Sequence, residues 1–79
     1  MNEVTINNPK LTARQAAEQF AATAFEEPRR IDWATLEVNE RPVPHSDSRL
    51  VATFRLLGGT LLYDLYALPA WKGWVIQVR

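Results

Sequence analysis

The chain has 79 residues, nine basic and nine acidic side chains, a formal net charge of zero and no cysteine. This length corresponds to one small domain over residues 1–79, which buries only about 60% of its unfolded surface and so has little stability to spare. The balanced charge argues against a field that attracts nucleic acid or an anionic membrane. A chain without cysteine forms no disulfide, and one histidine with scattered carboxylates lacks the spacing of a metal site.

Apolar residues make up 47% of the chain and include three tryptophans. This content favours a packed core over disorder. Neither the N-terminal sequence, MNEVTINNPK, nor any later segment has the apolar run of a signal peptide or a membrane span. We therefore expect a cytoplasmic protein with no membrane partner.

The first two predicted elements are a short strand and a helix. Residues 3–7 alternate apolar and polar side chains, which favours a strand over a loose tail. A helix is predicted from residue 13 to about 26, because Thr12 and Gln15 form a T-x-x-Q capping box and Pro28 cannot continue a helix. The apolar stripe of this helix is rich in alanine and should pack closely on a sheet; it consists of Ala13, Ala16, Ala17, Phe20, Ala21, Ala24 and Phe25.

Residues 32–40 are the hardest segment to assign. As a strand, they place Trp33 on the opposite side from the apolar residues at even positions. Asp32 could equally cap a short helix that ends before Pro42, and the sequence leaves both assignments open. We interpret the segment as a strand, because the hairpin that follows needs another neighbour. Residues 41–48, RPVPHSDS, are predicted to form a loop.

The strongest local signal is a hairpin of strands 49–57 and 60–68. The pair Gly58-Gly59 between two apolar runs favours a two-residue type I′ or II′ turn. Such a turn sets Phe54 opposite Tyr63. One face of the hairpin is then wholly apolar, with Leu50, Ala52, Phe54, Leu56, Leu61, Tyr63, Leu65 and Ala67.

The second face of the hairpin is only half polar. It holds Val51, Thr53, Arg55, Leu57, Thr60, Leu62, Asp64 and Tyr66. Arg55 lies diagonally from Asp64, which predicts an exposed ion pair worth at most ~1 kcal/mol. Residues 73–79 then alternate as a last strand that ends the chain.

Together these elements predict an α+β fold. One helix should pack on an antiparallel meander of three or four strands, preceded by the short strand, as a two-layer sandwich. The helix should cover the face that carries Phe54, Leu56, Tyr63, Leu65, Trp74 and Ile76.

The sequence contains few residues suited to catalysis. His45 is the single histidine, and the adjacent Ser46 and Asp47 cannot adopt the geometry of a catalytic triad without an unusual turn. The two glycines lead into a strand, whereas a phosphate-binding loop leads into a helix N-terminus. We therefore predict no catalytic residue, no metal and no cofactor.

The half-polar face is the candidate for function, because tyrosine, tryptophan and arginine are enriched where proteins meet. The predicted partner-binding residues are Trp33, Val51, Arg55, Leu62, Tyr66 and Trp71. We expect a small non-enzymatic protein-binding module, an inhibitor or adaptor of the kind that phages and plasmids direct against larger assemblies. Two alternatives stay open: a single-stranded nucleic-acid-binding module that uses the same aromatic and arginine face, which the zero net charge disfavours, and a homodimeric minor subunit of a larger complex.

Overall fold

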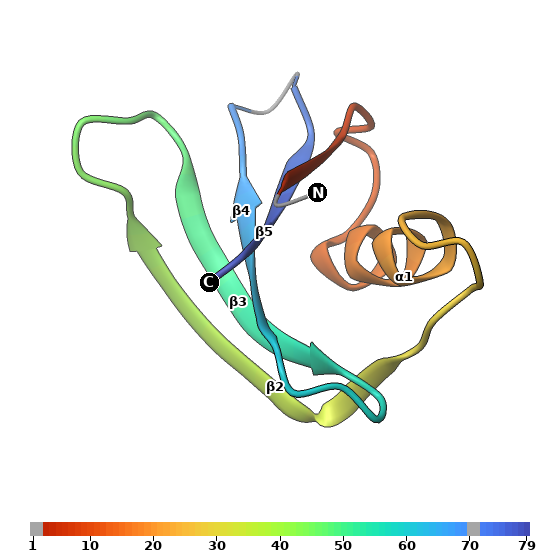
Figure 1. The fold of residues 1–79 in the computed structure, drawn as a ribbon. Helices are drawn as coiled ribbons and strands as arrows, with labels where there is room; N and C mark the ends of the chain where they lie inside the picture. The colour runs from red at the N-terminus through yellow and green to blue at the C-terminus, as the bar shows by residue number, and fades with distance from the viewer. Residues whose placement is uncertain (1–2, 70–71) are drawn as a thin grey trace.

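A computed structural model describes residues 3–69 and 72–79 of the chain. Its elements are β1 (Glu3–Ile6), α1 (Ala13–Thr23), β2 (Ile31–Pro42), β3 (Arg49–Leu56), β4 (Leu62–Ala67) and β5 (Trp74–Val78). The strands form one antiparallel sheet in the order β1-β5-β4-β3-β2, and α1 covers one of its faces (Figure 1). This confirms the predicted α+β class. The short N-terminal strand is present and pairs with β5, which gives the sheet five strands.

The start of α1 and the buried centre of its stripe are as predicted, whereas Ala24 and Phe25 lie beyond the end of the helix. The Gln15 N–H donates to Thr12 Oγ1 at 3.1 Å, and the Thr12 N–H donates to Gln15 Oε1 at 2.9 Å, which completes the capping box. Four residues of the stripe are buried: Ala16, Ala17, Phe20 and Ala21. The small alanine side chains let the helix lie close to the sheet.

The helix ends three residues earlier than predicted. Its last residue is Thr23, whose hydroxyl donates to the Gln19 carbonyl at 2.7 Å. The Arg29 N–H donates to the Ala21 carbonyl at 2.7 Å, so the connector folds back across the end of the helix. The chain has therefore left the helical path before Pro28 can act on it.

The core lies between α1 and the sheet. Phe54 and Tyr63 are opposite one another on β3 and β4, as predicted, and the Phe20 ring lies 6.2 Å and 5.2 Å from their ring centroids. The largest side chains with almost no exposed surface are Phe54, Leu56, Leu65 and Ile76. Trp74 packs against this cluster and its indole N–H donates to the Leu11 carbonyl at 3.2 Å.

The turn between β3 and β4 is wider than the predicted two-residue turn. It spans residues 57–61, with the Gly59 N–H bonded to the Leu56 carbonyl at 2.9 Å and Gly58 at φ 78°. The N–H of Leu57 donates to the Arg30 carbonyl instead of pairing across the hairpin. The last pair of the ladder is Arg55 with Leu62, so residues 56–57 and 60–61 are unpaired between β3 and β4. The register is kept because the same number of residues leaves the ladder on each side.

Three irregularities break the simple alternation of β2 and β3. In β3, Leu50 is opposite Tyr66 and Ala52 is opposite Leu65, so Val51 is an extra residue without a partner. This is a β-bulge, and it changes the face on which the preceding residues lie.

The other two irregularities are in β2: a small one between Val38 and Arg41, and a larger one between residues 32 and 37. The Asp32 carboxylate accepts from the Ala34 N–H at 3.2 Å, and its carbonyl accepts from the Thr35 hydroxyl at 2.7 Å. The same hydroxyl accepts the Arg55 N–H at 2.8 Å, in place of a backbone carbonyl. The local turn brings both Trp33 and Leu36 against the core, so the prediction that they point to opposite sides is wrong.

Candidate protein-binding face

We call the sheet face that points away from α1 the outer face. The strand pairing identifies its residues, because residues directly opposite one another share a face. One row across the five strands consists of Thr5, Val75, Tyr66, Leu50 and Arg41. The next row consists of Glu3, Gln77, Asp64, Thr53 and Glu37. A third, shorter row contains Leu62, Arg55 and Asp32.

The outer face is divided along the strands into two halves of different chemistry. The apolar half consists of Val43, Leu50, Tyr66, Leu68 and Val75, with Arg41 at its margin. The charged half consists of Glu37, Thr53, Arg55, Asp64 and Arg79. The sequence predicted a half-polar face, and in the structure most of its apolar side chains gather around Tyr66. The separation is incomplete, because Thr5 lies in the row of Tyr66 and Leu62 lies opposite Arg55.

The apolar half contains a shallow hollow of about 350 Å³. Its lining consists of Val43, Tyr66, Leu68 and Val75 together with the polar residues Glu3, Ser48 and Gln77. Leu50 is only 7% exposed yet lies outside the core cluster, which agrees with its position opposite Tyr66 on the outer face. The predicted placement of Leu50 on the helix-covered face is therefore wrong, and the bulge at Val51 is the reason.

The charged half is organised around the buried carboxylate of Asp64. The Thr53 hydroxyl donates to its Oδ1 at 2.9 Å. The guanidinium of Arg79 holds both oxygens, with Nη2 at 2.9 Å from Oδ1 and Nε at 3.3 Å from Oδ2. Among the described residues, no buried side-chain nitrogen or oxygen is left without a hydrogen bond. The network therefore offsets the cost of burying this charge.

The predicted ion pair between Arg55 and Asp64 is wrong. Arg55 lies opposite Leu62, and its Nη1 donates to the Thr60 carbonyl at 3.3 Å. Asp64 is engaged by Arg79, from beyond the end of β5, which the sequence alone does not place beside it. Asp64 thus binds Thr53, its direct cross-strand neighbour, and Arg79, which follows β5. The diagonal contact with Arg55 does not form.

The electrostatic setting of Tyr66 and Arg79 follows from this network. Burial, and next the charge of Asp64, raise the pKa of the Tyr66 phenol above its usual 10.0. The hydrogen bond from Arg79 to Asp64, and then their mutual attraction, raise the pKa of the Arg79 guanidinium. At neutral pH the outer face therefore presents a neutral phenol beside a neutralised ion pair.

The predicted site residues do not form one group. Tyr66 lies in the apolar half, and Arg55 and Leu62 lie in and beside the charged half. Val51 is the unpaired residue of the bulge. Trp71 lies outside the described residues.

Trp33 is not part of the outer face. Its ring packs against the core cluster, and Cζ of Arg14, from α1, lies 4.1 Å from its centroid. This cation–π contact covers the tryptophan on the helix side of the sheet. Arg14 also forms an exposed i,i+4 ion pair with Glu18, at 3.6 Å.

Sequence reasoning missed Val43, Leu50, Leu68 and Arg41 as neighbours of Tyr66. Arg41 and Leu50 reach this row through the irregularities of β2 and β3. The two prolines and the polar residues of 41–48 indicated a loop. Apart from the prolines, Val43 is the one apolar residue in this segment, and it was the one signal of an apolar contact.

Comparisons with protein-family models, curated proteins and solved structures give no match to this chain. Within residues 3–69 and 72–79, no group of three or more histidine, aspartate and glutamate side chains is arranged to hold a metal ion. In the same residues, no helix combines the length and apolar character that crossing a bilayer requires. The geometry of the outer face is therefore the basis for a proposal on function.

Proposed function

We propose that the protein is a small non-enzymatic protein-binding module, an inhibitor or adaptor, whose contact surface is the apolar half of the outer face. The observation that carries the proposal is a hollow that Tyr66, Leu68 and Val75 line and that no helix of residues 3–69 and 72–79 covers; polar residues complete its lining. A cytoplasmic setting is part of the proposal and suits a chain without cysteine.

The anatomy of the face supports this proposal. Protein interfaces combine an apolar centre with a polar rim, and tyrosine is prominent among the residues that dominate their energy. Here Tyr66 is central, Arg41 lies at the margin, and the charged half borders the hollow on one side. Hydrogen bonds tie Thr53, Asp64 and Arg79 of this rim together, which reduces the side-chain entropy lost when a partner binds.

The nucleic-acid alternative gains less from the same geometry. Phosphate binding needs several uncompensated positive charges. On the outer face, Arg79 is neutralised by Asp64, which leaves Arg41 and Arg55 as the cations of its three rows. A protein partner therefore remains the favoured reading.

The test is affinity capture from host extract, with quantitative comparison of Tyr66→Asp and Leu57→Asp. Leu57 is 59% exposed and lies in the turn between β3 and β4, away from the apolar half, so it is a matched control. We expect Tyr66→Asp to lose a partner that wild type and Leu57→Asp retain. Circular dichroism establishes that both variants are folded. An identical set of partners for all three proteins contradicts the proposal.

Light scattering on a size-exclusion column separates a foreign partner from a second copy. A dimer that Tyr66→Asp converts to a monomer identifies the partner as the chain itself. A monomer in both cases leaves the foreign protein as the occupant of the face.

A further inference from the structure

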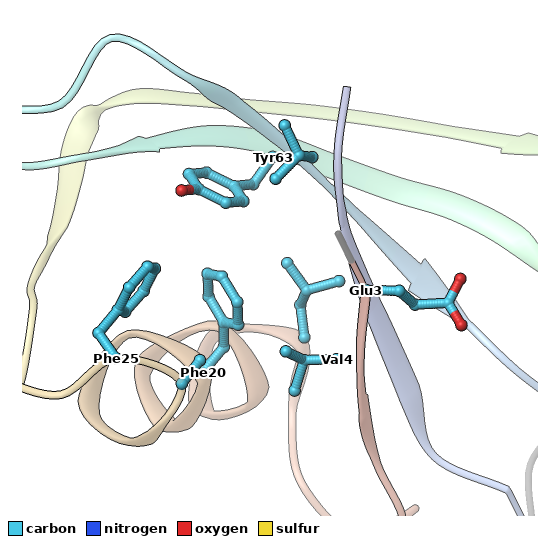
Figure 2. Close-up of a pocket in the computed structure, with 8 residues that line it drawn as sticks. Glu3, Val4, Phe20, Phe25 and Tyr63 are labelled. Atoms are coloured by element: carbon cyan, nitrogen blue, oxygen red, sulfur yellow. The ribbon is translucent and has the colours of Figure 1, made fainter. Parts of the chain in front are cut away.

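A pocket opens between the end of α1 and the sheet, on the side of the molecule opposite to the outer face (Figure 2). Its volume is about 120 Å³, and its walls include Val4, Phe20, Ala24, Phe25, Tyr63 and Ile76. The carboxylate of Glu3 points away from the pocket in Figure 2 and accepts the Gln77 amide at 2.6 Å on the outer face. The side-chain walls formed by Val4, Phe20 and Phe25 are therefore apolar, with polar atoms exposed between them.

The aromatic walls of the pocket are held in place by one another. The rings of Phe20 and Phe25 meet edge to face with centroids 5.6 Å apart, and Phe20 lies 5.2 Å from Tyr63. The early end of α1 at Thr23 and the small side chain of Ala24 leave the space between them unfilled. Its volume is close to the roughly 150 Å³ of an engineered apolar cavity that binds benzene.

A neighbouring hollow, which shares Tyr63 with the pocket, is lined by a cationic side chain. The Tyr63 hydroxyl points toward the Phe25 side of the pocket (Figure 2). Tyr63 and Arg29 together line the adjoining hollow, of about 230 Å³, and the Arg29 Cζ lies 5.3 Å from the Phe25 ring centroid. Within the described part of the chain, no carboxylate forms an ion pair with Arg29, although Glu26 and Glu27 lie in the same connector.

We propose that this pocket binds a small amphipathic carboxylic acid. The apolar body lies between Phe20, Phe25 and Val4, and the carboxylate meets the Arg29 guanidinium and the Tyr63 hydroxyl. The guanidinium only donates and the phenol can donate, which matches an acceptor-only carboxylate, whereas the guanidinium charge repels an ammonium group. The site is independent of the outer face, so this proposal and the proposed function stand or fall separately.

The probe for this site is hexanoate, compared with hexylamine of the same chain length. Titration into the ¹⁵N-labelled protein is expected to shift the amide signals of Phe20, Phe25 and Tyr63 saturably at millimolar concentration. Hexylamine should bind at least about tenfold more weakly, because it loses the charge-assisted hydrogen bonds to the two donors.

Two pairs of variants locate the binding. Ala24→Leu fills the pocket and Arg29→Gln removes the cation, and each should weaken hexanoate binding at least about fivefold. Ala22→Leu, on the exposed side of α1, and Arg30→Gln, outside both hollows, are the matched controls and should bind as wild type does. Ala24→Leu acts on the apolar end of the ligand and Arg29→Gln on its carboxylate end. Either variant is therefore enough to test the site if the other does not fold.

Three results would overturn the proposal. One is the absence of saturable shifts with hexanoate, and another is equal binding of hexylamine. The third is unchanged affinity in a folded Ala24→Leu or Arg29→Gln variant.

Discussion

Replacing Gly73 by alanine should lower the free energy of unfolding more than replacing Gly58 or Gly59 by alanine does. Gly73 precedes β5 at φ 95°, a conformation that L-residues rarely adopt. A Cβ at this position would overlap the carbonyl oxygen of Ile6 and lie 2.8 Å from the Asn8 nitrogen. Both atoms belong to backbone at the end of β1, so the clash cannot be relieved by a side-chain rotation.

The expected loss can be built from two contributions. A positive φ costs an L-residue about 1–2 kcal/mol. Moving the end of β1 away from Gly73 exposes part of Ile6, which is only 5% exposed, and full burial of an isoleucine contributes about 1.5–3 kcal/mol. The sum is about 3 kcal/mol, against a total stability of roughly 4–12 kcal/mol for a chain of this length.

Gly58→Ala is the matched control. Gly58 has φ 78°, but a Cβ there meets no atom within 4 Å, so only the backbone contribution of about 1–2 kcal/mol applies. Urea denaturation followed by tryptophan fluorescence gives both free energies of unfolding. A loss for Gly73→Ala no larger than that for Gly58→Ala would refute the close packing of β1 against this turn.

Three further predictions concern the network of the outer face. Thr53→Val removes a donor from the buried carboxylate of Asp64 and should lower the free energy of unfolding by about 1–2 kcal/mol in urea denaturation; an unchanged value would contradict the 2.9 Å hydrogen bond. Arg79→Gln should lower the urea midpoint more than Arg14→Gln does, because the partner of Arg79 is buried whereas the Arg14 pair is exposed; equal midpoints would show that the Asp64 pair carries no special weight. The raised pKa of Tyr66 contributes stability that is fully present below pH 10 and is lost as the pH rises through the folded-state pKa, so tyrosine absorbance at 295 nm should show a component above pH 10.0 that is absent in Tyr66→Phe.

Regular features of the fold could be predicted from local patterns. The capping box of Thr12 and Gln15 and the alanine stripe define α1, because both depend on residues three or four apart. The pairing of Phe54 with Tyr63 follows from the alternation on both sides of the turn, even though the turn itself is wider than predicted. In these elements, the structure indicated by residue propensity and by apolar periodicity is the same as the one that buries the apolar side chains.

The candidate site could be predicted only in outline, because it depends on backbone irregularities. The bulge at Val51 brings Leu50 beside Tyr66, and nothing in the alternation around Val51 distinguishes it from a regular strand. In β2, the Thr35 hydroxyl replaces a backbone acceptor, which redirects Trp33 toward the core. Arg79 reaches Asp64 only in the assembled sheet, so the sequence offered Arg55 as the nearer partner.

Site-specific photo-crosslinking tests the central proposal most directly. A photo-reactive phenylalanine analogue is placed in turn at Leu68, at Val75 and, as a control, at the exposed Leu57. If the apolar half is the contact surface, positions 68 and 75 should yield one common crosslinked protein in host extract, which Tyr66→Asp suppresses and position 57 does not give. Crosslinks from position 57 alone, or equal crosslinks from all three positions, would contradict the assignment of the apolar half as the binding surface.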